Sequence, residues 1–175
     1  MNVICFGDSN TYGYDPRSYL GDRYDADSRW VDILAEKTGW TVCNMGQNGR
    51  EIPSMSPNFP ADTDLLIVML GTNDLLQGRS PEQAAERLER FLSGISLDRS
   101  KIMLIAPPPM AMGEWVPSPQ LIEDSRTFAR LYQALAEWLG IRFADAGDIP
   151  LAYDGVHFTE QGHKAFAAGL LEELK

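Results

Sequence analysis

The sequence predicts an α/β protein, a three-layer α/β/α sandwich built on a five-stranded parallel sheet. Five short apolar runs alternate with segments whose apolar residues recur at helical spacing. The runs contain few polar residues, which is typical of parallel strands buried on both faces. No internal repeat or low-complexity segment interrupts the alternation. We therefore predict a single domain over residues 1–175 and, by analogy with other five-stranded folds, the strand order 2-1-3-4-5.

The first strand is expected over residues 2–6, which are too few for a helix and too apolar for an exposed loop. Gly7 ends this run, and Ser9 follows in the sequence Gly7-Asp8-Ser9. Ligands of open α/β sheets bind beyond the carboxyl ends of the strands, so Ser9 is well placed for a functional residue. Taken alone, these residues also fit a turn with Asx or serine side-chain bonding.

A long polar loop comes next and contains Tyr12 and Tyr14, which either line a pocket or pack the loop. A helix is then expected with Asp27 or Ser28 as its N-cap and with Gly39 as its stop. This helix returns the chain to the start of the second strand.

The second and third strands both end in polar, glycine-containing corners. The second strand is expected over residues 40–45 and closes in Asn44-Met45-Gly46-Gln47-Asn48-Gly49. Such a segment lets backbone N–H groups approach a ligand closely, although a glycine-rich turn explains it equally well. A proline-containing connection over residues 50–62 leads to the third strand, residues 64–70, which ends in Gly71-Thr72-Asn73-Asp74.

The second half of the chain repeats the alternation of helix and strand. Ser80-Pro81-Glu82-Gln83 predicts a helix start with a cap, a proline at the first position and a capping-box glutamine. The fourth strand is expected over residues 101–106 and the fifth over residues 141–144, with a helix between them. Asp154-Gly155-Val156-His157 follows, and the last helix starts near Thr159.

The polar corners after strands one, two, three and five face the same edge of a parallel sheet. Acyl transfer needs a serine nucleophile and a histidine base, which Ser9 and His157 supply. Asp154, three residues before His157, is placed to fix the tautomer of the imidazole and to stabilise its charged form. The backbone N–H groups of Ser9 and Gly46 and the Asn73 amide are candidate oxyanion donors. We therefore predict a serine esterase.

The motifs that carry these residues resemble those of the SGNH hydrolases, also called GDSL esterases and lipases. They are Ser9 in Gly7-Asp8-Ser9, Gly46 in Asn44-Met45-Gly46, Asn73 in Gly71-Thr72-Asn73-Asp74, and His157 in Asp154-Gly155-Val156-His157. They occur in the family's order, and the sequence is most similar to the small arylesterase and acyltransferase branch. The resemblance implies a flavodoxin-like sandwich, the SGNH hydrolase fold, with ester hydrolysis through an acyl-serine and no metal or organic cofactor. The segment around residues 50–62 is shorter than in larger arylesterases, so no oligomeric state is carried over.

The predicted substrates are small carboxylic esters with short acyl groups, such as acetyl esters of aryl alcohols or sugars. Asp8, Asn10 and Trp115 are predicted to contact the substrate. Trp115 lies in the apolar segment 107–117, which either walls an acyl or aryl pocket or covers the core.

The formal net charge of −10 argues against nucleic acid or an anionic membrane as a partner, because both need clustered cations and Lys and Arg are scattered here. Cys5 and Cys43 both fall in predicted buried strands, where reduced core side chains are favoured over a disulfide. The sequence shows no signal segment and no apolar run of about 18 residues. We therefore expect a cytoplasmic protein that acts on a small molecule.

Two other functions use some of the same residues. A metal-dependent phosphoesterase would place Asp8, Asp154 and His157 at strand ends, but such sites need more ligands in recognisable clusters. The chain contains only one other histidine, His163, which is expected to be a surface or helix-packing residue rather than a ligand. A flavodoxin-like binding module would leave the Asp154–His157 pair unexplained, and the glycine-asparagine segment lacks a P-loop lysine.

Overall fold

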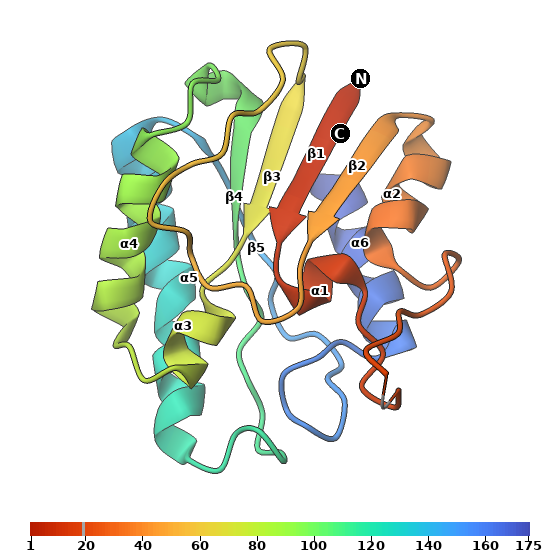
Figure 1. Ribbon diagram of the computed structural model, residues 1–175, viewed down its shortest axis with the longest axis vertical. Coiled ribbons are helices and arrows are strands. Elements are labelled where there is room, and N and C mark those ends of the chain that lie inside the picture. Colours follow the sequence, from red (N-terminus) through yellow and green to blue (C-terminus); the bar gives the residue numbers. More distant parts are fainter. Residues whose placement is uncertain (19) are drawn as a thin grey trace.

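A five-stranded parallel sheet forms the middle layer of the protein, with helices on both faces (Figure 1). The computed structural model describes residues 1–18 and 20–175. The strands are β1 (Asn2–Gly7), β2 (Thr41–Gly46), β3 (Leu65–Met69), β4 (Ile102–Ala106) and β5 (Arg142–Asp145). Their order is β2-β1-β3-β4-β5, and every pair is parallel. The predicted fold class and strand order are confirmed, and the strand ends differ from the predicted ones by one residue at most.

The helices form the two outer layers (Figure 1). On one face lie α2 (Trp30–Thr38) and α6 (Glu160–Glu173), and on the other lie α3 (Thr72–Leu76), α4 (Pro81–Ser93) and α5 (Pro119–Leu139). A single turn, α1 (Ser9–Tyr12), follows β1, and a 3₁₀ turn (Arg99–Lys101) precedes β4. Within the described ranges, no helix combines the length and the apolar character needed to cross a membrane.

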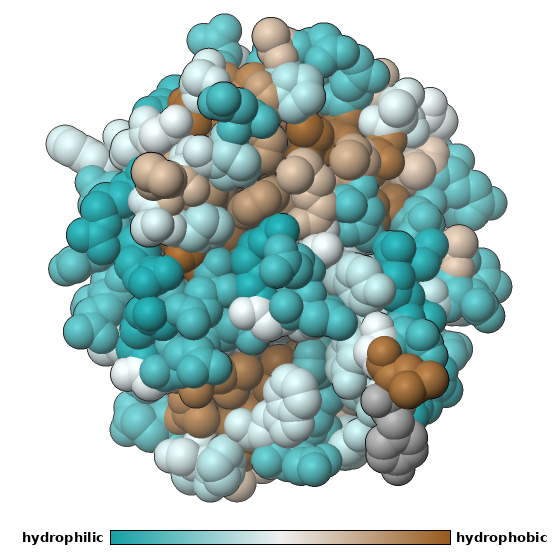
Figure 2. Space-filling model, viewed as in Figure 1, coloured by the Kyte–Doolittle hydropathy of each residue, from teal (hydrophilic) through white to brown (hydrophobic). Residues whose placement is uncertain are grey.

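The residues of β1 alternate between two hydrophobic clusters, one on each face of the sheet. Val3 and Cys5 pack in the cluster under α2 and α6, whereas Ile4 and Phe6 pack in the cluster under α4 and α5. Because both faces of this strand are buried, its sequence is a continuous apolar run. On the outside, Figure 2 shows hydrophilic side chains across the middle of one face, with separate hydrophobic areas above and below them.

The start of α2 differs from the prediction, whereas the start of α4 agrees with it. Arg29, not Asp27 or Ser28, is the N-cap of α2, and it makes no side-chain capping bond. The N–H groups of Ser28 and Arg29 bond to the carbonyl of Asp25, so this short turn delays the helix. In α4, Ser80 forms the predicted capping box.

Cys43 is exposed, which corrects the prediction that both cysteines are buried. Both thiols are free, and Cys5 lies in the core. β2 is an edge strand whose Val42 packs toward α2 and α6. Cys43 therefore points to the opposite face, where α4 and α5 cover the inner strands and do not reach β2.

Candidate active site

The candidate active site lies at the carboxyl edge of the sheet, below the strand arrowheads in Figure 1. Ser9 begins α1 shortly after β1, and Asn73 lies in α3 shortly after β3. Asp154 and His157 lie in the connection between β5 and α6. These segments surround a pocket of about 230 Å³. Its lining residues are Ser9, Tyr14, Asn48, Gly49, Asn73, Trp115 and His157.

Ser9, His157 and Asp154 form a continuous line of polar contacts. Ser9 Oγ lies 3.0 Å from His157 Nε2, and His157 Nδ1 lies 2.7 Å from Asp154 Oδ2. All three residues are at most 5% exposed, so water does not compete strongly for these contacts. When Nδ1–H donates to Asp154, Nε2 is left as the acceptor for the serine proton. The arrangement has the geometry of a nucleophile, its base and the group that orients the base.

The Asp154 carboxylate is fixed by several donors. Its Oδ1 accepts the backbone N–H groups of Val156 and His157, each at 2.9 Å, while Oδ2 faces the imidazole. Burial alone would raise the pKa of this carboxyl. The hydrogen bonds from the His157 ring, the His157 backbone and Val156 outweigh burial and hold the pKa of Asp154 below its usual value. The carboxylate therefore stays ionised beside the imidazole.

The tight turn that presents Ser9 depends on its neighbours. Asp8 is the N-cap of α1, and its Oδ1 accepts the Asn10 N–H at 2.9 Å. A Cβ on Gly7 would lie 2.1 Å from Thr11 Oγ1, so a larger residue would push the turn away from the strand. The Ser9 N–H makes no hydrogen bond within the described residues and is available to a ligand.

Asp8 and Asn10, which were predicted to contact the substrate, are not among the residues that line the pocket. Both are buried, at 2% and 3% exposure. Asn10 donates to the Val156 carbonyl at 3.1 Å and accepts the Phe158 N–H at 2.9 Å. The Asn10 side chain therefore ties the nucleophile turn to the loop that carries His157, and Asp8 caps the turn itself.

The predicted donor Gly46 lies outside the pocket as well. Its N–H donates to Asn44 Oδ1 at 2.9 Å, and a Cβ on Gly46 would lie 2.0 Å from the Tyr12 nitrogen. Gly46 therefore allows close packing of β2 against α1 rather than presenting its N–H to a ligand. Gly49, three residues later, lines the pocket with a φ of +71°. Its N–H makes no hydrogen bond to the described part of the chain, and sequence reasoning missed it.

Arg50 links the ends of β1 and β2 to Asn73, and this role was not predicted from the sequence. Its guanidinium donates to the carbonyls of Gly7, at 2.8 Å, and Met45, and stacks over the Phe6 ring at 4.2 Å. Its own carbonyl accepts one Asn73 amide N–H at 3.1 Å. An amide nitrogen carries two N–H donors, so the second donor of Asn73 remains free for a ligand in the pocket. The available sequence signal was an arginine directly after the glycine-asparagine segment of residues 44–49.

Two aromatic rings flank the imidazole. The Trp115 ring lies 4.9 Å from the His157 ring and nearly perpendicular to it, and the Tyr14 ring lies 4.6 Å away. Trp115 was predicted to contact the substrate, and it lines the pocket. Of the two tyrosines in the polar loop, Tyr14 lines the pocket, whereas the Tyr12 ring stacks under Arg23.

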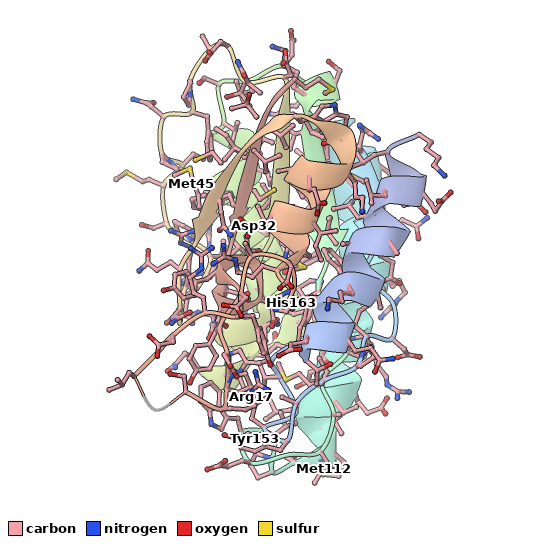
Figure 3. The ribbon with its side chains drawn as sticks, turned by 90° about the vertical axis from the view of Figure 1, so that its right-hand side faces the viewer. Arg17, Asp32, Met45, Met112, Tyr153 and His163 are labelled. Carbon is pink, nitrogen blue, oxygen red and sulfur yellow. The ribbon has the colours of Figure 1, made fainter. Side chains whose placement is uncertain are left out.

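His163 is a helix-packing residue, as expected. It is fully buried on α6 (Figure 3), with the rings of Tyr24 and Phe158 at 5.5 and 5.1 Å. Burial, with smaller contributions from the neighbouring Arg29 and His157 side chains, lowers the pKa of His163 to about 3. It is therefore neutral at pH 7. In the ranges described, no group of three or more His, Cys, Asp or Glu side chains is arranged to hold a metal ion.

Asp8 provides a test of the electrostatics of the nucleophile turn. Burial raises the pKa of its carboxyl to about 6, although the Asn10 N–H and the nearby side chains of His157 and Arg50 act in the opposite direction. The folded protein therefore binds this proton more tightly than the unfolded chain, whose value is near 3.8. Below about pH 4 the Asp8 carboxyl is protonated in both the folded and the unfolded protein, and its burial carries no charge penalty. As the pH rises from about 4 to about 6, the unfolded chain loses this proton first, and the folded protein loses about 3 kcal/mol of stability.

We expect Asp8→Asn to stabilise the protein at neutral pH, because asparagine keeps the helix cap without the buried charge. Thermal unfolding at about pH 4 and about pH 7.5 measures this. The melting temperature of the variant should exceed that of the wild type only at the higher pH. The exposed Asp98→Asn variant is the control, and an equal gain at both pH values would contradict the charge argument.

Comparisons with known proteins identify the family and the fold. The model of the GDSL-like lipase/acylhydrolase family matches residues 5–165. No curated protein matches the chain in sequence.

Several solved structures share the fold over nearly its whole length. A carbohydrate acetylesterase from Sinorhizobium meliloti is 26% identical with a TM-score of 0.78, and the alignment covers 99% of this chain and 97% of that one. The aryl esterase of M. smegmatis is 28% identical with a TM-score of 0.77 and the same coverage. A carbohydrate acetylesterase family member from Sinorhizobium meliloti is 25% identical with a TM-score of 0.82, covering 99% of this chain and 96% of that one.

Proposed function

The chain belongs to the GDSL-like lipase/acylhydrolase family, as its motifs predicted, and is a carboxylic ester hydrolase. On this premise we propose that residues 1–175 act as a single catalytic domain and hydrolyse small carboxylic esters through an acyl-Ser9 intermediate. The observation that carries the proposal is the contact of Ser9 Oγ with His157 Nε2 at 3.0 Å, at the wall of the pocket. Asp154 supports the other side of the imidazole at 2.7 Å.

In the first half of the reaction, His157 Nε2 takes the proton of Ser9 as Oγ forms a bond to the ester carbonyl carbon. The carbonyl oxygen becomes an oxyanion. It accepts hydrogen bonds from the backbone N–H groups of Ser9 and Gly49 and from one N–H of the Asn73 amide. The bond to the alcohol oxygen then breaks, and the imidazolium gives its proton to that oxygen. The products are a free alcohol and an acetyl or similar short acyl group on Ser9.

In the second half, water replaces the alcohol. His157 takes one proton of the water as its oxygen attacks the acyl carbon, and the same donors hold the second oxyanion. The bond to Ser9 Oγ breaks, the serine recovers its proton from the imidazolium, and the carboxylic acid leaves. Asp154 remains ionised throughout, holding Nδ1–H and stabilising the positive imidazole.

The proposed substrates are acetyl and other short-chain esters of aryl alcohols or sugars. Structural relatives at 26% and 28% identity are a carbohydrate acetylesterase and an aryl esterase, which supports this range. The pocket of about 230 Å³ suits a small acyl group with part of one ring rather than a long acyl chain.

Acetyl transfer to Ser9 tests the proposal directly. The protein is mixed with p-nitrophenyl acetate, quenched early and digested, and the peptide that contains Ser9 is weighed by mass spectrometry. We expect one acetyl group on Ser9 and turnover that EDTA leaves unchanged. Turnover that EDTA abolishes, without an acetyl group on Ser9, would favour the metal-dependent phosphoesterase class instead.

We expect Asn73→Ala to lower kcat by about 10²–10³ and to change KM little, because the lost donor matters most once the oxyanion carries charge. The Asn73 side chain also donates to the Arg50 carbonyl, so the loss in unfolding free energy should be about 1 kcal/mol. Steady-state kinetics and thermal unfolding measure the two effects.

Asn73→Asp sharpens the test, because the carboxylate has the same shape and repels an oxyanion. This variant should be at least as inactive as Asn73→Ala. A near-normal kcat together with a much lower melting temperature would assign Asn73 to turn structure alone.

A further inference from the structure

We propose that Tyr14 and Trp115 form the binding site for the alcohol half of the ester, and that this site selects a ring with an apolar face. The inference rests on the proposed acyl-Ser9 reaction and adds to it which half of the substrate meets the aromatic wall. The shared chemistry is a flat aryl ring or the apolar face of a pyranose.

The position of the alcohol follows from the proton that it must receive. The leaving oxygen has to come within about 2.6–3.2 Å of the proton donor, which is His157 Nε2. The rings of Tyr14 and Trp115 flank that imidazole at 4.6 and 4.9 Å. The same pocket is also lined by Asn48, Gly49 and Asn73, which carry the polar donors proposed for the oxyanion. Because the oxyanion faces those polar groups, the alcohol is left on the aromatic side.

The backbone segments that carry both rings are bonded to the segments that carry the reacting groups. The Tyr14 N–H donates to the Ser9 carbonyl at 3.0 Å, and the Trp115 N–H donates to the Asp154 carbonyl at 3.1 Å. The segment around Trp115 also packs closely against the loop that carries Asp154 and His157, since a Cβ on Gly113 would lie 2.3 Å from the Asp154 carbonyl carbon. The backbone at Tyr14 and Trp115 therefore keeps its position relative to the loop of His157, and a substrate ring that packs against the two side chains meets a largely preformed site.

The surface around these rings suits a neutral, partly apolar group. Trp115 is 46% exposed, a large aromatic area left open at the mouth of the pocket. Met112 and Tyr153 are exposed at the same end of the molecule, as Figure 3 shows. The described residues that line the pocket include no Lys or Arg, so nothing there would pair with a phosphate or carboxylate on the alcohol.

The experiment compares leaving groups at constant acyl group. Ethyl acetate, benzyl acetate and methyl 6-O-acetyl-glucopyranoside are all acetates of primary alcohols, and only the last two carry a ring. We expect Trp115→Ala and Tyr14→Leu each to lower the ratio of kcat/KM for a ring ester to that for ethyl acetate about tenfold. Trp115→Phe should restore most of the ratio. Trp138→Ala, which removes an exposed tryptophan at the distal end of α5, is the matched control and should leave the ratio unchanged.

The measurements with benzyl acetate and with the glucoside distinguish an aryl alcohol from a sugar alcohol. A loss confined to benzyl acetate supports an aryl ring, a loss confined to the glucoside supports a sugar, and a loss for both supports either ring. An unchanged ratio overturns the inference. A change in preference between ethyl acetate and ethyl hexanoate, with the ring ratio constant, also overturns it, because the rings would then contact the acyl half. Absence of acetyl-Ser9 in the wild type is a separate result that rejects the underlying reaction.

Discussion

Ser9→Ala is expected to lower kcat for ester hydrolysis by a factor on the order of 10⁶, because it removes the atom that would form the acyl bond. The fold should persist. The turn around residue 9 is held by the Asp8 cap and the Asn10 side chain, neither of which uses the serine hydroxyl. The measurement is the initial rate with p-nitrophenyl acetate, with circular dichroism and thermal unfolding as checks on folding.

A fluorophosphonate probe gives an independent readout of the same residue. The wild type should be labelled on Ser9, and Ser9→Ala should not be labelled. Ser93→Ala, an exposed serine on α4, is the control that should keep both rate and labelling. Full labelling of Ser9→Ala would show that another residue is the nucleophile.

Asp154→Asn is expected to lower kcat by about 10⁴ with a much smaller change in KM. Asparagine Oδ1 can keep the bonds from the Val156 and His157 backbones, so the loop should hold its shape. The new NH₂ group would face Nδ1 as a donor. That contact turns the imidazole into the tautomer with a proton on Nε2, which cannot take the proton of Ser9.

Steady-state kinetics and melting temperature together test this variant. The exposed Asp148→Asn, on the same connection between β5 and α6, is the control for loss of one negative charge and should stay close to wild-type activity. If Asp154→Asn kept its rate within about tenfold of the wild type, the imidazole would not depend on this carboxylate.

The fold was predictable because its main determinants are local in sequence. A strand buried on both faces reads as an unbroken apolar run, and the capping box at Ser80 marks a helix start by itself. The pairing of Asp154 with His157 is also local, since three residues separate them and Asp154 accepts the His157 backbone N–H.

The missed features depend on contacts between distant segments. Gly46 and Gly49 both suit a close backbone approach, and only the packing of β2 against α1 decides which of them faces the pocket. Cys43 lies on a strand whose pattern does not show that it is at the edge of the sheet. Asn10 sits beside the nucleophile in sequence but bonds to a loop at the other end of the chain.

That bond of Asn10 has a consequence for how activity arises during synthesis. Its partners Val156 and Phe158 are 146 and 148 residues further along the chain. Closing so long a loop costs conformational entropy that only the finished sheet and helices can offset. A nascent chain with β1, β2 and β3 already paired would carry the serine turn but no base. Hydrolysis should therefore begin only when the last loop docks, so the appearance of activity in a refolding experiment would time the final step of assembly.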